Sequence, residues 1–210
     1  MSRTLSRFFV GGVTVTLALV VGGCGGGGGG DKSEARPGGS AAPPSTTTAP
    51  ARIDLSQPIP GGSLHGTPRP PLENTGDDYV AIFESLMANL RWVSENPDPT
   101  VLADLLVPGT PGHDERVPAY QFLVDNGYRW ADDGYQLLTV EVIDARAGAV
   151  SLRVTDRLEF ERLVDSSGNQ VGDIRQRGAA QTYTVLLTAD ADNRWRVADS
   201  SRVSDQVVQL

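Results

Sequence analysis

The chain has 210 residues, of which 39% are hydrophobic, a formal net charge of −8 and a single cysteine. The negative balance argues against nucleic-acid binding, because a protein that neutralises phosphates needs clustered lysine and arginine. One cysteine excludes any disulfide within the chain, so a folded domain has to be stabilised by its hydrophobic core.

The first 23 residues have the parts of an export signal in the expected order. Arg3 and Arg7 give a positive start, and an apolar stretch runs from Phe8 to Val21. At about 14 residues, this stretch is shorter than the roughly 20 that a membrane-spanning helix needs. Two small glycines then precede Cys24 and leave the backbone open to a peptidase. Residues 1–23 are therefore predicted to be a removable signal peptide.

The sequence Val21-Gly22-Gly23-Cys24 resembles the lipobox of bacterial lipoproteins, although most lipoboxes carry Leu where this chain has Val21. The resemblance implies that a diacylglyceryl group is joined to the Cys24 sulfur and that the signal is cut between Gly23 and Cys24. Two or three acyl chains make a stable membrane anchor. The expected location is the extracytoplasmic face of the cell membrane. The alternative is an ordinary secretory signal followed by a free cysteine.

Residues 24–76 contain almost no apolar periodicity. They include a run of six glycines from Gly25 to Gly30 and a Pro/Ser/Thr-rich stretch at residues 41–50. Such a composition cannot bury enough apolar surface to offset the entropy lost on ordering. We expect a disordered tether. The short apolar island Ile53-Asp54-Leu55 either packs on the following domain or belongs to the tether.

The folded domain is predicted to span residues 77–210 and to begin with helices. Apolar residues at three- and four-residue intervals predict a first helix from Asp78 to Glu95. A short second helix is predicted at residues 99–106. A third is predicted at residues 114–126, with Gly127 as its left-handed end.

After Gly134 the apolar pattern changes from helical to alternating. It predicts strands at residues 136–145, 150–164, 181–189 and 194–204, joined by short turns that favour antiparallel neighbours. The second strand, at about 15 residues, is too long to stay flat and is expected to contain a bulge or a strong coil. The prediction is an α+β fold in which about three helices pack on a long, curved, cone-like antiparallel sheet of four strands.

The element order and the final hairpin, Tyr183 to Leu187 followed by Asn193 to Val197, resemble the nuclear transport factor 2-like superfamily. This superfamily includes ketosteroid isomerases, polyketide cyclases and many accessory domains without chemistry. The resemblance implies a pocket between the helices and the concave face of the sheet. A signal, a low-complexity tether and one such domain are together similar to lipoproteins of high-GC Gram-positive bacteria.

Three polar residues are candidates for that pocket: Asp156, Tyr183 and Asp199. Strict alternation along the strands places each of them on an apolar face. A carboxylate and a phenol facing one cavity are the minimum set for proton abstraction beside a carbonyl group. In the alternative interpretation a bulge turns Asp156 to the surface, Tyr183 fills the core and Asp199 is solvated.

No catalytic residue, metal or cofactor is predicted. The chain lacks a Gly-x-Ser-x-Gly nucleophile turn, and His65 and His113 fall in the tether and in a Pro/Gly-rich break. We therefore expect a non-enzymatic domain that binds an envelope protein or an apolar small ligand. The alternative is a small cavity enzyme of the isomerase or dehydratase type that uses a buried carboxylate. The sequence does not decide whether the protein forms a homodimer through the outer face of the sheet.

Overall fold

The structure is a computed structural model that describes residues 54–57, 64–172, 174–176 and 178–202. The expected signal peptide, Cys24 and the first part of the expected tether lie outside the described residues. Within the described ranges, no helix combines the length and the apolar character that crossing a bilayer requires.

Helix α1 (Tyr79–Glu95) forms the centre of the helical layer. It begins at Asp78, whose side chain accepts a hydrogen bond from the backbone N–H of Ala81 at 3.1 Å, a standard way to satisfy a free donor at a helix start. Its buried face carries apolar side chains at helical spacing, including Phe83, Leu86 and Val93. The first predicted helix is therefore present over nearly its whole expected length.

Four shorter helical segments follow α1: η1 (Pro99–Val101), α2 (Leu102–Leu105), α3 (Pro111–Asp114) and α4 (Arg116–Asn126). The predicted third helix is present as α4, which begins two residues later than expected, and the short α3 precedes it. Pro118 explains the break between α3 and α4, because it has no N–H to donate to the carbonyl of Asp114 four residues earlier. Helix α4 ends at Gly127, which has the predicted left-handed conformation with φ 64°.

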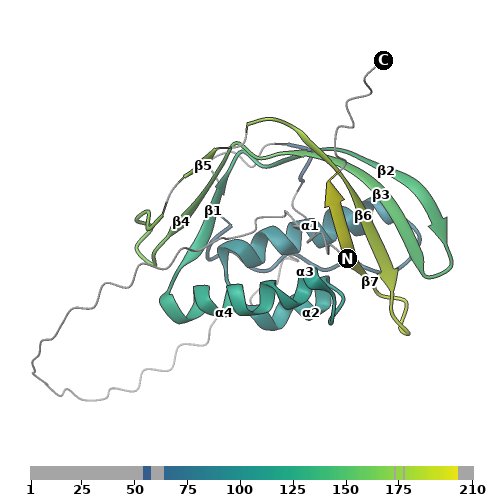
Figure 1. Cartoon of the computed structure of the whole chain (residues 1–210), viewed down its shortest axis with the longest axis horizontal. Coiled ribbons are helices and arrows are strands. Elements are labelled where there is room, and N and C mark those ends of the chain that lie inside the picture. The colour runs from purple at the N-terminus through teal and green to yellow at the C-terminus, as the bar shows by residue number, and fades with distance from the viewer. Residues whose placement is uncertain (1–53, 58–63, 173, 177, 203–210) are drawn as a thin grey trace, which may run out of the picture. The chain divides into compact units, whose positions relative to one another are not determined.

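The strands form two antiparallel sheets. Their bounds are β1 (Arg129–Asp133), β2 (Gln136–Arg146), β3 (Ala149–Arg157), β4 (Phe160–Val164), β5 (Arg175–Gln176), β6 (Gln181–Ala189) and β7 (Trp195–Arg202). One sheet has the order β2-β3-β6-β7 and the other the order β1-β4-β5. Figure 1 shows the strands arching over α1, with the remaining helices on the same concave side. Strands β1 and β5 were not predicted.

The predicted strand at residues 150–164 is divided into β3 and β4, and it bends beside a glycine. Gly134 joins β1 to β2 with φ +73°, and a Cβ added there would lie 2.8 Å from Cγ of Glu159, between β3 and β4. The two neighbouring strand pairs therefore turn at the same place. This bend is the irregularity expected in so long a strand, and it separates the two sheets.

The hydrophobic core lies between the four-stranded sheet and α1. Val150, Leu152, Val154, Val185 and Leu187 alternate along β3 and β6, and each is at most 1% exposed. They belong to one buried cluster with the apolar face of α1. The fold is α+β, with helices covering the concave face of an antiparallel four-stranded sheet, as the sequence predicts.

The folded part begins earlier than residue 77, so the expected boundary is corrected. Leu55 and Leu64 are 2% and 8% exposed. The backbone N–H of Leu137 donates to the carbonyl of Leu55 at 2.8 Å, and that of Trp195 donates to the carbonyl of Asn74 at 2.7 Å. A segment without periodicity can still be ordered when single leucines fill the core and its carbonyls accept from strand ends. The apolar island therefore contributes Leu55 to the domain.

Candidate functional site

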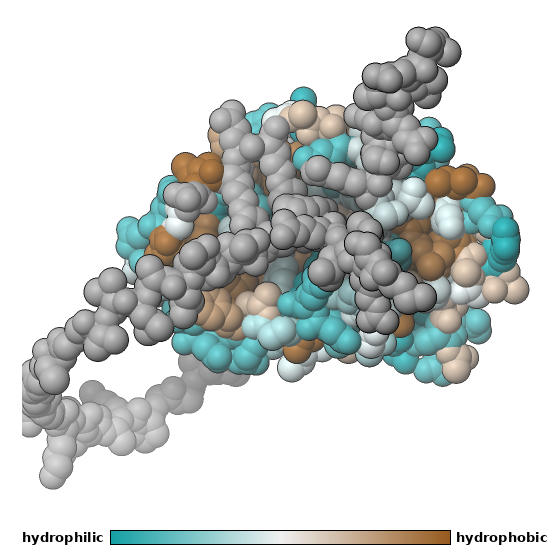
Figure 2. All heavy atoms as spheres, in the orientation of Figure 1, coloured by the Kyte–Doolittle hydropathy of each residue, from teal (hydrophilic) through white to brown (hydrophobic). Residues whose placement is uncertain are grey.

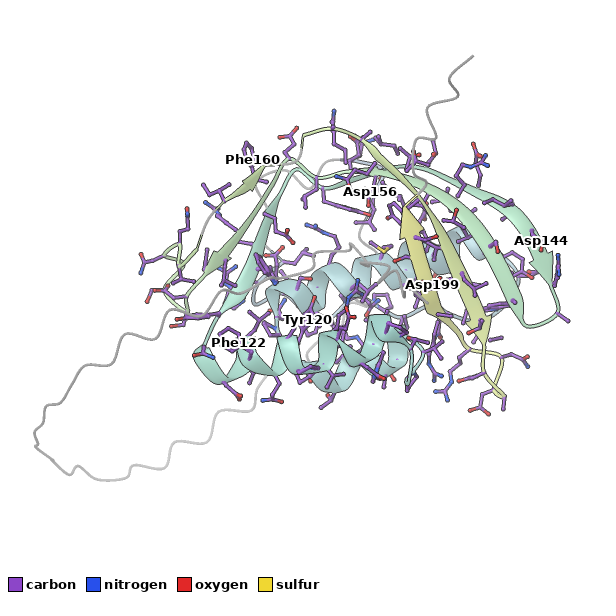
Figure 3. The ribbon with its side chains drawn as sticks, viewed as in Figure 1. Tyr120, Phe122, Asp144, Asp156, Phe160 and Asp199 are labelled. Carbon is purple, nitrogen blue, oxygen red and sulfur yellow. The ribbon has the colours of Figure 1, made fainter. Side chains whose placement is uncertain are left out.

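Asp156 lies on the concave face of the four-stranded sheet. The pairing of β3 with β6 runs without interruption from Ala149 opposite Thr188 to Asp156 opposite Gln181. Alternation therefore places Asp156 on the same face as the buried Leu152 and Val154. Figure 3 shows it near the top of the arch formed by the strands. No bulge turns it to the outer surface.

Two phenol groups converge on one oxygen of this carboxylate. The hydroxyl of Tyr183, on β6, donates to Oδ2 of Asp156 at 2.7 Å. The hydroxyl of Tyr135, at the β1–β2 junction, donates to the same oxygen at 3.4 Å, near the outer limit for a hydrogen bond. Tyr135 and Tyr183 are only 4% and 9% exposed. The structure thus brings two of the three predicted residues, Asp156 and Tyr183, together and adds Tyr135.

Burial keeps both phenols protonated. Burial is the main cause that raises the pKa of Tyr183 well above its ordinary value, and the neighbouring Tyr135 and Asp156 raise it further. Burial also raises the pKa of Tyr135, with Asp156 adding to the effect and the cation of Arg91 opposing it. A phenolate in this place would lose its hydration and face a carboxylate. The two hydroxyls are therefore fixed hydrogen-bond donors at physiological pH.

The helices contribute two cations to the region around the phenols. The guanidinium carbon of Arg91, on α1, lies 4.4 Å from the ring centroid of Tyr135, within the range of a cation–π contact. Arg91 is 5% exposed. Arg116 is near the start of α4; burial lowers its pKa, while Tyr120 and Tyr183 raise it. We call Asp156, Tyr135, Tyr183 and Arg91 the acid–phenol cluster.

Asp199 is not part of this cluster, and its expected face is corrected. A register shift in the β6–β7 pairing places Leu187 opposite Val197 but Leu186 opposite Asp199. The extra residue in β7 reverses the alternation, so Asp199 lies on the opposite face from Val197. It is exposed, and Figure 3 shows it on β7, apart from Asp156.

The sequence analysis missed Tyr135 and Arg91. The α1 row Phe83, Met87, Arg91 and Glu95 has a four-residue spacing, and all four side chains are buried. A cation and an acid on an apolar helix face are a signal of a polar centre. Glu95 is fully buried, and its Oε2 accepts from the backbone N–H of Leu64 at 2.8 Å. Tyr135 gave no such signal, because it lies at a junction between strands.

Chemically, the acid–phenol cluster offers a carboxylate, two phenol donors and a cation in a largely buried place. Such a set can either orient a bound carbonyl compound or hold strands and helix together. Among the residues that the structure describes, no group of three or more His, Cys, Asp or Glu is placed to hold a metal ion. The ring of His65 is within hydrogen-bond distance of the carbonyl of Glu95, and the ring of His113 is within hydrogen-bond distance of the carboxylate of Asp114.

Comparison with known proteins places the chain near several solved structures. No family model and no curated protein matches it. An uncharacterised protein with a cystatin-like fold from Caulobacter vibrioides has 16% identity and a TM-score of 0.39, over 61% of this chain and 92% of that one. A ketosteroid isomerase-like protein from Erwinia carotovora atroseptica has 20% identity and a TM-score of 0.37, over 61% and 99%. The protein Aln2 from a Streptomyces species has 10% identity and a TM-score of 0.39, over 60% and 91%.

These matches include fold names from the superfamily that the sequence resembles. The three identities are at most 20% and the three TM-scores at most 0.39. The architecture stands on its own strand order and register.

Proposed function

We propose that this protein is a lipid-anchored lipoprotein on the extracytoplasmic face of a bacterial membrane, and that its folded domain binds a protein partner. The anchor is proposed from Cys24, which follows a short apolar segment and two glycines. The Gly-rich composition after Cys24 supports a tether. That tether ends before Leu55, because Leu55 is buried in the domain.

The observation that carries the proposed binding activity is an apolar surface on strand β2. Leu138, Val142 and Ile143 are 41%, 45% and 48% exposed, and we call them the β2 apolar edge. Strand β2 has 11 residues and pairs only with β3 among the described strands. Figure 2 shows hydrophobic surface over this part of the sheet, at the upper right. An apolar edge strand with free backbone groups is a ready template for another chain.

Charged residues border this surface. Arg153 and Glu141 form an ion pair of 3.5 Å, and Arg146 and Asp144 form one of 2.8 Å. These side chains are at least half exposed, so the pairs contribute little to stability. Apolar side chains with a polar rim are the usual anatomy of a protein–protein interface. An exposed edge strand favours a protein partner over the apolar small ligand, which needs a concave site.

The acid–phenol cluster supports binding over catalysis. A general base must reach the proton that it removes, directly or through one water molecule. In this cluster Oδ2 of Asp156 already accepts from Tyr183 at 2.7 Å, and the phenols around it are at most 9% exposed. The proposed role of the cluster is to join β3, β6 and the β1–β2 junction under the arch.

A small cavity enzyme of the isomerase or dehydratase type is the second candidate. The observation in its favour is the same cluster, since a buried carboxylate beside phenol donors and Arg91 can polarise a carbonyl group. Turnover of an enolisable ketone by the purified protein, lost in Asp156→Asn, would establish this alternative and overturn the binding proposal.

Site-specific photo-crosslinking tests the β2 apolar edge. A photoreactive amino acid replaces Val142 in the full-length protein in its native envelope, and a matched protein carries it at Val124 on α4, which is also 45% exposed. We expect one discrete adduct with another protein from position 142 and none from position 124. The substitution Val142→Asp should abolish binding of that partner while changing the free energy of unfolding by no more than about 0.5 kcal/mol. Equal labelling at both positions, or adducts only within the chain, would contradict the proposal.

A further inference from the structure

A cleft lies at the β7 edge of the four-stranded sheet, beside the first residues of β7. It has a volume of about 370 Å³ and is lined by Arg69, Pro70, Leu72, Asn74, Asp104, Arg194 and Arg196. Its walls come from the segment before α1, from α2 and from the β6–β7 turn. Since β2 and β7 are opposite edges of the sheet, the cleft is separate from the β2 apolar edge.

Arg69 is held in this cleft by two side chains. Its Nε donates to Oδ1 of Asn89 at 2.8 Å, and its Nη1 lies 3.3 Å from Oδ2 of Asp104. Asn89 is fully buried and donates to the carbonyl of Ser85 at 2.9 Å, so its oxygen is fixed in place. The third nitrogen, Nη2 of Arg69, is buried and has no hydrogen-bond partner among the described residues.

Arg196 is held by a carboxylate that is itself fixed. Nη2 of Arg196 lies 2.9 Å from Oδ2 of Asp190. The other oxygen of Asp190 accepts from the backbone N–H groups of Asp192 and Arg194, each at 2.9 Å. The hydrogen bond from the Arg194 backbone is the main cause that lowers the pKa of Asp190. Nε of Arg196 is buried and, like Nη2 of Arg69, has no partner within the described part of the chain.

The guanidinium groups of Arg69 and Arg196 line the cleft and define what it can accept. Guanidinium groups only donate hydrogen bonds, so a ligand that satisfies them must bring acceptor oxygens. Charged donors of this kind pair best with carboxylate or phosphate oxygens, whose geometry matches the guanidinium fork. Pro70 and Leu72 add apolar surface to the same lining. The volume is that of a site for a small molecule, at the low end of the roughly 300–1,000 Å³ range.

Counting charges shows that the attraction is local. The lining has three arginines and one aspartate, but Asp190 and Asp192 pair with Arg194 and Arg196. These six charges cancel, and the whole chain is negative at −8. A small anion is therefore not drawn in by a long-range field. It is recognised by the guanidinium groups that line the cleft, of which Arg69 and Arg196 each have one nitrogen without a hydrogen-bond partner among the described residues.

We propose that this cleft binds a small organic anion, a carboxylate or a phosphate ester with a short apolar part. Arg69 and Arg196 donate to its oxygens, and Pro70 and Leu72 contact its carbon chain. This site is independent of the β2 apolar edge and does not require the anchor at Cys24.

Calorimetric titration of the full mature protein tests the proposal with three probes of equal chain length: hexanoate, hexyl phosphate and the neutral hexanol. We expect one of the two anions to bind at least about tenfold more tightly than hexanol, and the comparison between them identifies the preferred acidic group. Arg69→Gln and Arg196→Gln should each weaken that anion by about tenfold or more. Arg153→Gln, a change at an exposed arginine on β3, should leave it unchanged.

A second measurement uses the unsubstituted protein and therefore does not depend on whether the variants fold. In the unsubstituted protein, the Nε–H signals of Arg69 and Arg196 should shift during the NMR titration, while that of Arg153 should not. Equal affinity for hexanol, no binding of either anion at millimolar concentration, or full affinity in both folded arginine variants would overturn the proposal. Val142→Asp should retain anion binding, so failure of one proposal is distinguishable from failure of the other.

Discussion

At the residue scale, the carboxylate of Asp156 accepts hydrogen bonds from two phenol groups that stay protonated in the folded protein. The 2.7 Å hydrogen bond from Tyr183 is the shorter of its two phenol contacts. Removing that hydroxyl leaves a half-buried carboxylate with the 3.4 Å contact from Tyr135 as its remaining phenol. A hydrogen bond to a charged group contributes about 1.5–3 kcal/mol, which is more than a bond between neutral groups contributes.

Tyr183→Phe should lower the free energy of unfolding by about 1–3 kcal/mol, because it keeps the ring and removes only the donor. Urea unfolding followed by tryptophan fluorescence measures this change. Tyr128→Phe is the matched control, since Tyr128 is half-buried and no hydrogen bond to its hydroxyl is present in the described part of the chain. An equal loss of unfolding free energy in both variants would show that the hydrogen bond from Tyr183 to Asp156 does not stabilise the protein.

The raised phenol pKa values predict a loss of stability at alkaline pH. In the unfolded chain Tyr135 and Tyr183 ionise near the ordinary value of 10.0, whereas in the folded protein they keep their protons to higher pH. Above pH 10 the unfolded state therefore binds fewer protons. The free energy of unfolding should fall as pH rises, by about 1.4 kcal/mol per pH unit for each phenol.

Absorbance at 295 nm between pH 9 and 11 checks this prediction. The Tyr135→Phe/Tyr183→Phe double variant should show the same native-state tyrosinate signal as the parent protein, because neither phenol ionises before unfolding. A smaller signal in the double variant would mean that these two groups titrate in the folded state.

At the element scale, the bend between the two sheets depends on a residue without a side chain. Gly134 has φ +73°, and the β3–β4 junction brings the side chain of Glu159 within 2.8 Å of the place where a Cβ would lie. Both the backbone conformation and the close approach require glycine there. The bend places Tyr135 at the junction, within hydrogen-bond distance of Asp156.

Gly134→Ala should destabilise the protein more than Gly148→Ala does. Gly148, in the β2–β3 turn, has a similar φ of +76° but nothing within 4 Å of an added Cβ, so its substitution costs only the backbone strain of about 1–2 kcal/mol. The difference between the two variants in chemical denaturation measures the contact with Glu159. It should shrink when Glu159→Ala is added to Gly134→Ala. An equal loss at both glycines would show that the contact is accommodated.

At the scale of the whole molecule, the two edges of the four-stranded sheet differ in how far other segments of the chain cover them. The β7 edge is partly covered, because the Leu106–Val197 bridge and the carbonyl of Asn74 satisfy its first residues. On the β2 edge, the carbonyl of Leu55 accepts a hydrogen bond from the backbone N–H of Leu137, and the apolar residues beyond Leu137 are exposed.

Cys24→Ala should release the protein into the medium, because without its acyl chains nothing in the acidic chain attracts an anionic bilayer. Fractionation of cells into membrane and medium measures the change, with Ser45→Ala in the expected tether as the control that stays bound. Membrane retention of the Cys24→Ala protein, or an unmodified thiol in the mass of the mature N-terminus, would contradict the anchor.

Strand alternation and helical spacing predicted the structure correctly where a strand or helix runs without a bulge or a break. The predicted strand at residues 181–189 coincides with β6, and Asp156 lies on the expected face because β3 has no bulge before it. Alternation failed at Asp199, where one extra residue in β7 reverses the face. A bulge depends on the partner strand, so a single strand's pattern cannot reveal it.

By itself the sequence determined the periodicities, and through them the α+β class, the order of helices before strands and two members of the acid–phenol cluster. Its composition also carries the proposed anchor at Cys24. Only the tertiary structure decided that Tyr135 meets Asp156 and Arg91, that Leu55 enters the core and that Arg69 and Arg196 line the same cleft. The reason is that periodicity is set by neighbours along the chain, whereas these contacts join residues far apart in sequence, whose meeting depends on how the sheet bends over the helices.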